Sequence, residues 1–337
     1  MIFPLAQWLQ APYMLGAAAL VALALLLLYL WLRRPRGGAQ PVSSQVGMSA
    51  HDPRDEITQP LPVTIRPRVN TLSSATVRAA ARTDKGRSRP INEDDTLLAE
   101  LADSEGRIRT GLYAVADGMG GHDQGEVASR TAIEATIDAL QVHPFFAESV
   151  YLEDSFSDNE VLDVLRDAMA SANKAVYGVR VEQGSNLGTT LVLALVLRSK
   201  AYIANVGDSR AYLIRHGEAR QLTEDHSLVE RMVATGQITR AEARLHPQRN
   251  LILRSLGSDP HIDVDLFVEH LQPGDRLLLC SDGLTGMLAD DKLSHLASAE
   301  PDLDKACRML VRAANEAGGT DNISVVLAKV LDTDGHE

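Results

Sequence analysis

The stretch Leu112-Tyr113-Ala114-Val115-Ala116-Asp117-Gly118-Met119-Gly120-Gly121 places an acidic residue and three glycines directly after an apolar run. The run is typical of a buried strand. The Asp-Gly step after it is typical of a turn, because Asp bonds to its own backbone and Gly accepts positive φ. Two other apolar runs end in the same way, at Gly207-Asp208 and at Ser281-Asp282-Gly283. Carboxylates at the ends of buried strands can converge, so this pattern predicts an acidic site at the rim of a sheet.

Two further acidic motifs flank this region. They are Arg89-Pro90-Ile91-Asn92-Glu93-Asp94 and Gly319-Thr320-Asp321-Asn322, and the second precedes the apolar run Ile323–Val330. Taken singly, each motif is more often a plain turn than a ligand site. Taken together, they supply hard oxygen ligands that suit Mg²⁺ or Mn²⁺, whereas a zinc site would need nearby Cys and His.

Hydrophobic periodicity predicts an α+β chain. Short turns such as Ser199-Lys200 and Arg215-His216-Gly217 join neighbouring strands as hairpins, which favours antiparallel sheets with helices on their outer faces. Asp158 is the expected N-cap of a long helix. Helices are predicted at 125–140, 158–182 and 302–317, and strands at 76–82, 96–99, 111–116, 189–197, 200–206, 211–215, 264–269, 276–280 and 323–331.

In this order and with these neighbours, the motifs resemble the protein phosphatase 2C family of metal-dependent serine/threonine phosphatases, and its bacterial branch in particular. The resemblance covers residues 76–331. It implies a central antiparallel β-sandwich flanked by helices on both sides, with metals in a cleft at one end and a flap at residues 221–256. Further matching motifs are Thr83-Asp84-Lys85-Gly86, Gly188-Thr189-Thr190, Asp225-His226-Ser227 and Ser281-Asp282-Gly283-Leu284-Thr285.

The same resemblance implies two Mn²⁺ or Mg²⁺ ions, with a third that binds more weakly. Asp117 is expected to bridge the first two ions, and Gly118 to add its backbone carbonyl. Asp282 and Asp321 are expected to complete the ligands of the first metal. The glycines after Asp117 would let the backbone approach the ions closely.

The second metal is assigned by resemblance to Glu93 and Asp94, either directly or through water molecules. Which of these two residues is the direct ligand stays open, because the family varies at the position of Glu93. Asp208 resembles the ligand of the third ion, shared with Asp282. Asn322 is expected to orient its neighbour.

Catalysis is expected to use a water molecule activated between two metals. Arg89 is placed to bind the phosphoryl oxygens with its fork of donors, which makes it both a substrate-binding and a catalytic residue. The leaving alkoxide needs a proton. His122 is a candidate general acid, but a residue that packs at the start of a helix is an equal interpretation, and water on the third metal is another donor. Met119 stands where many eukaryotic relatives carry a His.

Charge divides the chain into three parts. Residues 1–32 carry no charged side chain, residues 33–75 carry six Arg against three acidic residues, and the remainder carries 27 basic and 42 acidic residues, a net charge of −15. Such a surface repels nucleic acid. The two cysteines, Cys280 and Cys307, are too few for a disulfide framework. Neither is followed by Arg six positions later, so a cysteine-dependent phosphatase is excluded.

The N-terminal part predicts a membrane anchor. Residues 13–32 form an uncharged run of twenty residues, long enough as a helix to cross a bilayer. A cleaved signal peptide would have its basic residues before the apolar run, whereas Arg33, Arg34 and Arg36 follow it. Basic flanks stay on the cytoplasmic side. We therefore expect a single-pass protein of the inner, cytoplasmic membrane, with residues 1–12 outside and the catalytic domain in the cytoplasm.

The region after the anchor is typical of a linker. Residues 33–75 are rich in Pro, Ser and Gly, which predicts a disordered segment with an end-to-end distance of roughly 35–40 Å. The catalytic domain follows at residues 76–331, and residues 332–337 form a tail.

The leading hypothesis is a membrane-anchored phosphatase that hydrolyses phosphoserine and phosphothreonine in proteins and opposes a serine/threonine kinase. The alternatives are a catalytically inactive phosphoprotein-binding module, a dedicated phosphatase of a single anti-sigma-type regulator, and a nucleotide or sugar phosphatase. An inactive module would be expected to lack metal-binding carboxylates, and all of them are present.

Overall fold

The computed structural model describes residues 76–102, 108–120, 124–143, 156–197 and 199–331. The predicted membrane helix, the linker, the C-terminal tail and His122 lie outside these residues. Within the described ranges, no helix combines the length and the apolar character that a membrane crossing needs.

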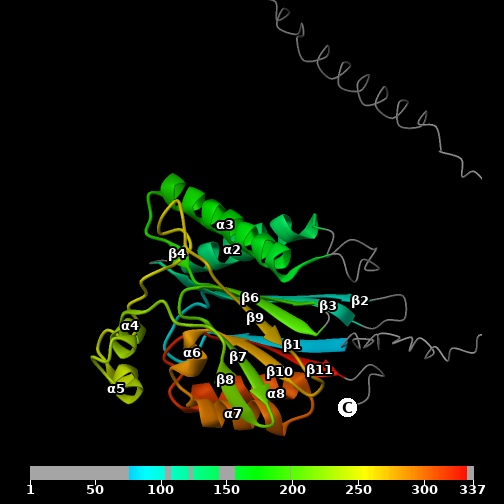
Figure 1. Ribbon diagram of the computed structural model, residues 1–337. Helices are drawn as coiled ribbons and strands as arrows, with labels where there is room; N and C mark the ends of the chain where they lie inside the picture. The colour runs from blue at the N-terminus through cyan, green and yellow to red at the C-terminus, as the bar shows by residue number, and fades with distance from the viewer. Residues whose placement is uncertain (1–75, 103–107, 121–123, 144–155, 198, 332–337) are drawn as a thin grey trace, which may run out of the picture. The chain divides into compact units, whose positions relative to one another are not determined.

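Two antiparallel sheets stack on one another (Figure 1). The first contains, in spatial order, β1 (Thr76–Asp84), β11 (Ile323–Leu331), β10 (Arg276–Cys280), β7 (Arg210–Arg215) and β8 (Glu218–Gln221). The second contains β2 (Asp94–Ala102), β3 (Ile108–Met119), β5 (Leu191–Leu197), β6 (Lys200–Val206) and β9 (Asp265–His270), and the short β4 (Gly188–Thr189) pairs with the end of β3.

Helices cover both outer faces of the sandwich. The second sheet is covered by α2 (Gln124–Gln141) and α3 (Asp158–Gln183), and the first by α6 (Asp282–Thr285), α7 (Asp290–Ala299) and α8 (Leu303–Glu316). Three apolar clusters fill the spaces between the layers, one under each group of helices and one between the sheets. The predicted helix–sheet–sheet–helix sandwich is confirmed, and both cysteines are buried apolar residues in it.

Local sequence explains the bounds of α3. Ser157, and not the predicted Asp158, is the N-cap, and it forms a capping box with Glu160. The Asp158 carboxylate instead accepts bonds from Lys200 Nζ and Tyr202 Oη on β6. Gly184 ends the helix in the left-handed conformation. The prediction of the N-cap was therefore wrong by one residue, because Asp and Ser both suit that position.

Other elements differ from the prediction where the apolar pattern is short. The strand predicted at 189–197 is interrupted at Thr190, whose backbone N–H donates to Asp117 O at 2.9 Å. The short elements β8, α6 and α7 were not predicted. In α7 only Leu293, Ser294 and Ala297 are buried, too few to make a periodic pattern stand out.

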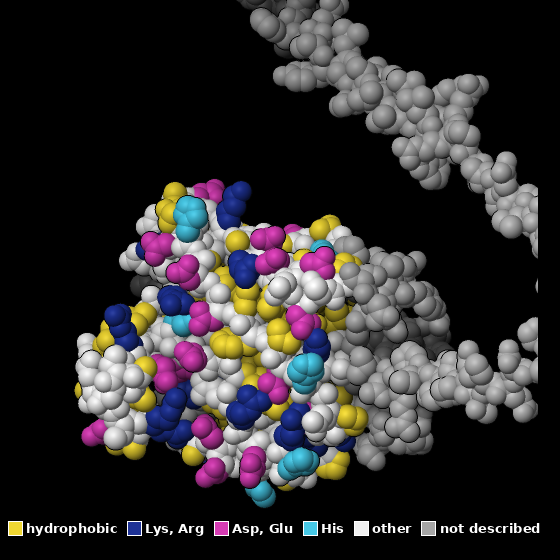
Figure 2. Space-filling view, viewed as in Figure 1, with side chains coloured by type: hydrophobic (Ala, Val, Ile, Leu, Met, Phe, Trp, Pro, Cys, Tyr) yellow, Lys and Arg dark blue, Asp and Glu magenta, His cyan; other side chains and the backbone are white. Residues whose placement is uncertain are grey.

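The flap projects beside the sandwich at the left of Figure 1. It contains α4 (Leu228–Ala234) and α5 (Arg240–Leu245), neither of which buries a residue. The apolar side chains of α4, Leu228, Met232 and Val233, are therefore only partly covered. On the face shown in Figure 2, acidic and basic side chains are interspersed. The excess of acidic charge is not gathered there in one patch.

Candidate active site

The predicted acidic residues come from strand ends that meet at one edge of the sandwich. Asp94 and Asp117 are direct partners across the β2–β3 pair. Asp208 lies in the turn between β6 and β7, Asp282 begins α6 directly after β10, and Asp321 precedes β11. The structure thus brings together five carboxylates that are spread over more than two hundred residues of sequence.

These carboxylates repel one another in a buried environment. Burial, and then the charges of Asp94, Asp282, Asp208 and Asp321, raise the pKa of Asp117 well above its usual value. Burial and, to a smaller extent, neighbouring carboxylates raise the pKa of Asp94 to about 7 and that of Asp282 to about 6. Such a cluster costs free energy unless it is protonated or neutralised by cations.

The donor set fits a divalent cation. Asp94 Oδ1 and Asp208 Oδ1 are buried and have no hydrogen-bond partner within the described part of the chain. Unpaired carboxylate oxygens beside further acidic groups are what Mg²⁺ and Mn²⁺ require. No three His, Cys, Asp or Glu side chains of the described residues are already arranged to hold a metal ion. The fit therefore rests on the chemistry of the donors.

Glu93 and Asp94 face different surroundings. Glu93 Oε1 accepts a bond from Gly125 N at 3.2 Å, and Glu93 O accepts one from Ser129 Oγ at 2.7 Å. Asp94 Oδ2 accepts from Ser281 Oγ at 2.8 Å, which leaves its other oxygen in the acidic cluster. Glu93 therefore ties the start of β2 to the start of α2, whereas Asp94 belongs to the carboxylate cluster.

Gly118 is required by packing. A Cβ on this residue would lie 2.1 Å from Gly125 O and 2.5 Å from Glu93 O. The sequence suggested that this glycine lets the backbone approach a metal ion. The structure gives a different reason, because the missing side chain lets β3 pack against the first turn of α2.

Two motifs that bear no metal carboxylate position the acidic residues. Asn322 donates to Ile91 O at 2.9 Å and accepts from Glu93 N at 2.9 Å, which fixes the loop before β2. Thr190 Oγ1 accepts from Asp117 N at 3.0 Å, and Thr189 Oγ1 donates to Asp117 O at 2.9 Å. The sequence showed Gly188-Thr189-Thr190 only as a motif and did not predict this role. The available signal was the pair of polar threonines directly before the apolar run Leu191–Leu197.

Arg89 lies at the edge of the cluster. Its Nη2 donates to Asp321 Oδ2 at 2.7 Å, and its side chain is 45% exposed. The bond to Asp321 and the nearby acidic charges raise the pKa of Arg89 from its already high value. Arg89 therefore presents a permanent positive charge next to the carboxylates and remains accessible to an anion from solvent.

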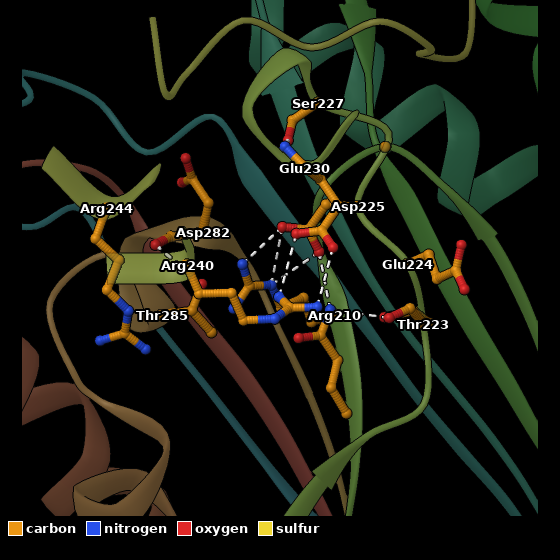
Figure 3. Close-up of polar contacts among 12 residues, drawn as sticks. Arg210, Thr223, Glu224, Asp225, Ser227, Glu230, Arg240, Arg244, Asp282 and Thr285 are labelled. Carbon is orange, nitrogen blue, oxygen red and sulfur yellow. Dashed lines mark hydrogen bonds and ion pairs between the residues drawn. The ribbon is translucent and has the colours of Figure 1, made fainter. Parts of the chain in front are cut away.

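A second arginine, Arg210, is partly buried and pairs with Asp225 (Figure 3). Arg210 Nη2 lies 2.6 Å from Asp225 Oδ2, and Arg210 Nη1 donates to Tyr212 Oη at 2.9 Å. The charge of Arg210 counteracts the increase in the pKa of Asp282. A cavity of about 390 Å³ adjoins this pair, lined among others by Asp208, Asp282, Arg240 and Arg244.

Comparisons with known proteins agree with the fold and the site. A family model described as protein phosphatase 2C matches residues 81–231, and one described as stage II sporulation protein E matches residues 240–331. The serine/threonine phosphatase stp of Listeria welshimeri is 39% identical over 255 residues, which cover 75% of this chain and 96% of that protein.

Two crystal structures are also similar. That of the Mycobacterium tuberculosis serine/threonine phosphatase PstP/Ppp has a TM-score of 0.65 at 34% identity, covering 76% of this chain and 99% of that one. That of the catalytic domain of the phosphatase PstP in complex with two manganese ions has a TM-score of 0.63 at 33% identity, covering 77% and 100%.

The chain belongs to the protein phosphatase 2C family and is a protein serine/threonine phosphatase. The resemblance of the motifs is thereby confirmed. The expectation of Mn²⁺ or Mg²⁺ is confirmed at the level of the family, because the related catalytic domain binds two manganese ions. The role of each site residue stays a prediction, and His122 lies outside the described residues.

Proposed function

We propose that this protein is a membrane-anchored, metal-dependent phosphatase that hydrolyses phosphoserine and phosphothreonine in proteins and opposes a serine/threonine kinase. Asp94, Asp117, Asp282 and Asp321 hold two Mn²⁺ or Mg²⁺ ions, and Gly118 contributes its carbonyl. Asp208 would hold a third ion, which binds more weakly.

The observation that carries this proposal is the contact between Arg89 and Asp321 at the rim of the carboxylate cluster. It places a permanent cation beside the residues that would hold the metals. When bound, the ions supply Lewis acidity and lower the pKa of water towards neutrality. Arg89 binds and orients the phosphoryl oxygens, because its planar donors match them in pairs.

The surrounding protein fixes the carboxylates before substrate arrives. Thr189 and Thr190 hold the backbone of Asp117, and Ser281 holds one oxygen of Asp94. Glu93 is taken up by its bonds to the start of α2 and acts through water molecules, so Asp94 is the direct ligand of the second metal. This arrangement limits reorganisation during the reaction, which is where preorganised polar sites gain most of their effect.

Anchoring rests on the sequence alone. The uncharged run at residues 13–32 and the arginines that follow it support a single helix with the catalytic domain in the cytoplasm. A phosphatase held in this way would act on phosphoproteins at the same membrane.

The experiment is a comparison of substrates with full-length protein. Phosphothreonine and phosphoserine peptides should be hydrolysed in Mn²⁺, and a phosphotyrosine peptide or a nucleotide should be hydrolysed much more slowly. Binding of phosphopeptide without turnover would instead support the inactive binding module. Turnover confined to one phosphoprotein would support the dedicated regulator phosphatase.

A further inference from the structure

Gly207, the residue before Asp208, is held at two points by His226. The backbone N–H of Gly207 donates to the ring atom Nδ1 of His226 at 3.1 Å, and the backbone N–H of His226 donates to Gly207 O at 2.9 Å. Gly207 has φ +113°, and a Cβ there would lie 2.5 Å from the Thr190 side chain. Only glycine suits this position, and the two bonds restrain the peptide groups on both sides of it.

The residue after Asp208 is also held by a hydrogen bond. Ser209 Oγ and Thr190 Oγ1 are 2.8 Å apart and share a hydrogen bond. Thr190 is the same residue that accepts from Asp117 N. Asp208 therefore lies between two anchored neighbours, and its own Oδ1 is buried and unpaired within the described part of the chain.

The bond from Gly207 shows which ring nitrogen of a neutral His226 carries the proton. An acceptor nitrogen carries no proton, so a neutral ring has its proton on Nε2. Nε2 lies 3.1 Å from Asp265 Oδ2 and donates to it. Arg254 Nη1 lies 3.3 Å from Nε2 and is the second donor to Asp265, whose Oδ1 it contacts at 3.0 Å. Asp265, at the start of β9, thus receives both donors and fixes the ring.

Both ends of the flap meet at the same histidine. The flap leaves the sandwich at Ser227, the N-cap of α4. It returns at Leu253, whose N–H donates to His226 O at 2.6 Å, and Arg254 follows. The His226 side chain is only 6% exposed, so solvent does not compete for these bonds.

We propose that His226 is a positioning residue that sets Asp208 for cation binding through Gly207, and that it connects this cation site to the root of the flap. The proposal rests on the assignment of Asp208 as a metal ligand in the proposed function. Residues that orient a metal ligand without touching the metal commonly change metal affinity about 10- to 100-fold when they are replaced.

Two isosteric variants separate positioning from simple packing. In His226→Asn, Oδ1 takes the place of Nδ1 and still accepts from Gly207 N–H. In His226→Leu, a methyl group occupies that place and the acceptor is lost. Binding of Mn²⁺ to full-length protein is measured from the free Mn²⁺ signal in electron paramagnetic resonance, with Asp208→Asn marking the weak site.

We expect His226→Leu to weaken the Asp208-dependent site roughly 10-fold or more and to leave tighter Mn²⁺ binding unchanged. His226→Asn should stay near the wild-type affinity. Equal affinities in the two variants would overturn the proposal, as would a weak site that Asp208→Asn does not affect. If the leucine variant does not fold, the smaller His226→Ala, which also lacks the acceptor for Gly207 N–H, replaces it, with the same selective weakening expected.

The ring itself can be observed in wild-type protein without any variant. Nitrogen-15 spectra of the metal-free protein should show an unprotonated Nδ1 and a protonated Nε2 for His226. A proton on Nδ1 would contradict the geometry. Both measurements are independent of turnover, so a protein that binds Mn²⁺ as described but hydrolyses no phosphopeptide would defeat the proposed function and leave this inference standing.

Discussion

Asp94 and Asp117 face each other across the β2–β3 pair, so two buried carboxylates are neighbours by strand register alone. Because each belongs to a regular strand, the sheet holds their backbones side by side. The raised pKa of Asp94, about 7, reflects its burial and the surrounding acidic charges. The fold thus stores electrostatic repulsion at the point where the metals are proposed to bind.

Asp117→Asn and Asp282→Asn should each abolish phosphatase turnover, because each removes a charged ligand from the proposed metal pair. Each variant should also bind Mn²⁺ more weakly in a direct titration. Asp302→Asn, at the exposed start of α8, serves as a control that keeps full activity. Normal turnover in either site variant would remove that residue from the ligand set.

Arg89→Ala should raise KM by about 10- to 100-fold with a smaller change in kcat, since a charge-assisted hydrogen bond contributes about 1.5–3 kcal/mol. Arg166→Ala removes a comparably exposed arginine on α3 and should change neither constant. Steady-state kinetics on a phosphothreonine peptide measures both. An unchanged KM in the Arg89 variant would show that this residue does not bind phosphate.

Gly118→Ala should lower the free energy of unfolding by about 1–3 kcal/mol, because the added Cβ collides with backbone oxygens that cannot move independently. Gly178 is the matched control inside α3, where an added Cβ would meet no described neighbour within 4 Å beyond its own helix backbone. Gly178→Ala should stabilise by about 0.5–1 kcal/mol. Denaturant unfolding of the two variants tests both signs. Equal effects would contradict the packing described for Gly118.

The stability of metal-free protein should rise as pH falls from about 7.5 to about 5.5. Asp94 and Asp282 have pKa values raised to about 7 and about 6, above those of the unfolded chain, so the folded state binds protons more tightly. The stabilisation is complete below the unfolded pKa and is lost as pH rises through the folded values. In saturating Mn²⁺ the trend should reverse, because protons compete with the metal.

Thermal unfolding across this pH range, with chelator and with Mn²⁺, measures both trends. Asp94→Asn should show a smaller pH dependence in chelator. If the melting temperature fell on acidification as steeply in chelator as in Mn²⁺, the raised pKa values of the carboxylate cluster would be contradicted.

The acidic residues of the candidate site could be picked out from the sequence because their signals are local. Asp-Gly steps at strand ends mark Asp117 and Asp282, and the strand at 323–331 was predicted with its observed bounds. The sequence could not separate Glu93 from Asp94, which depends on contacts with Gly125 and Ser281 far along the chain. These tertiary hydrogen bonds support the proposal that Asp94 is the direct ligand, and they leave no periodic trace in the sequence.

The contacts that hold the neighbours of Asp208 could not be predicted from the sequence for the same reason. The sequence shows His226 only as the middle residue of the motif Asp225-His226-Ser227, and a lone His gives no indication of its partners. Its bonds to Gly207 and Asp265 join residues 19 and 39 positions away along the chain. Only the fold brings the three together.

The membrane orientation predicted from the sequence can be tested by fusion. A reporter that works only in the cytoplasm, joined after Glu337, should be active, and protease added to spheroplasts should spare the catalytic domain. Replacing Arg33, Arg34 and Arg36 with neutral residues should weaken the orientation without preventing insertion, because hydrophobicity drives insertion and charge sets direction. Full-length protein found in the cytosolic fraction would argue against the anchor.

The most direct test of the central claim is the metal dependence of phosphothreonine peptide hydrolysis by full-length protein. We expect turnover in Mn²⁺ or Mg²⁺, complete loss when a chelator removes the metal, and recovery when the metal is returned. Asp117→Asn should remain inactive after metal is returned, which controls for a contaminating phosphatase. Undiminished hydrolysis by wild-type protein in excess chelator would contradict metal-dependent catalysis.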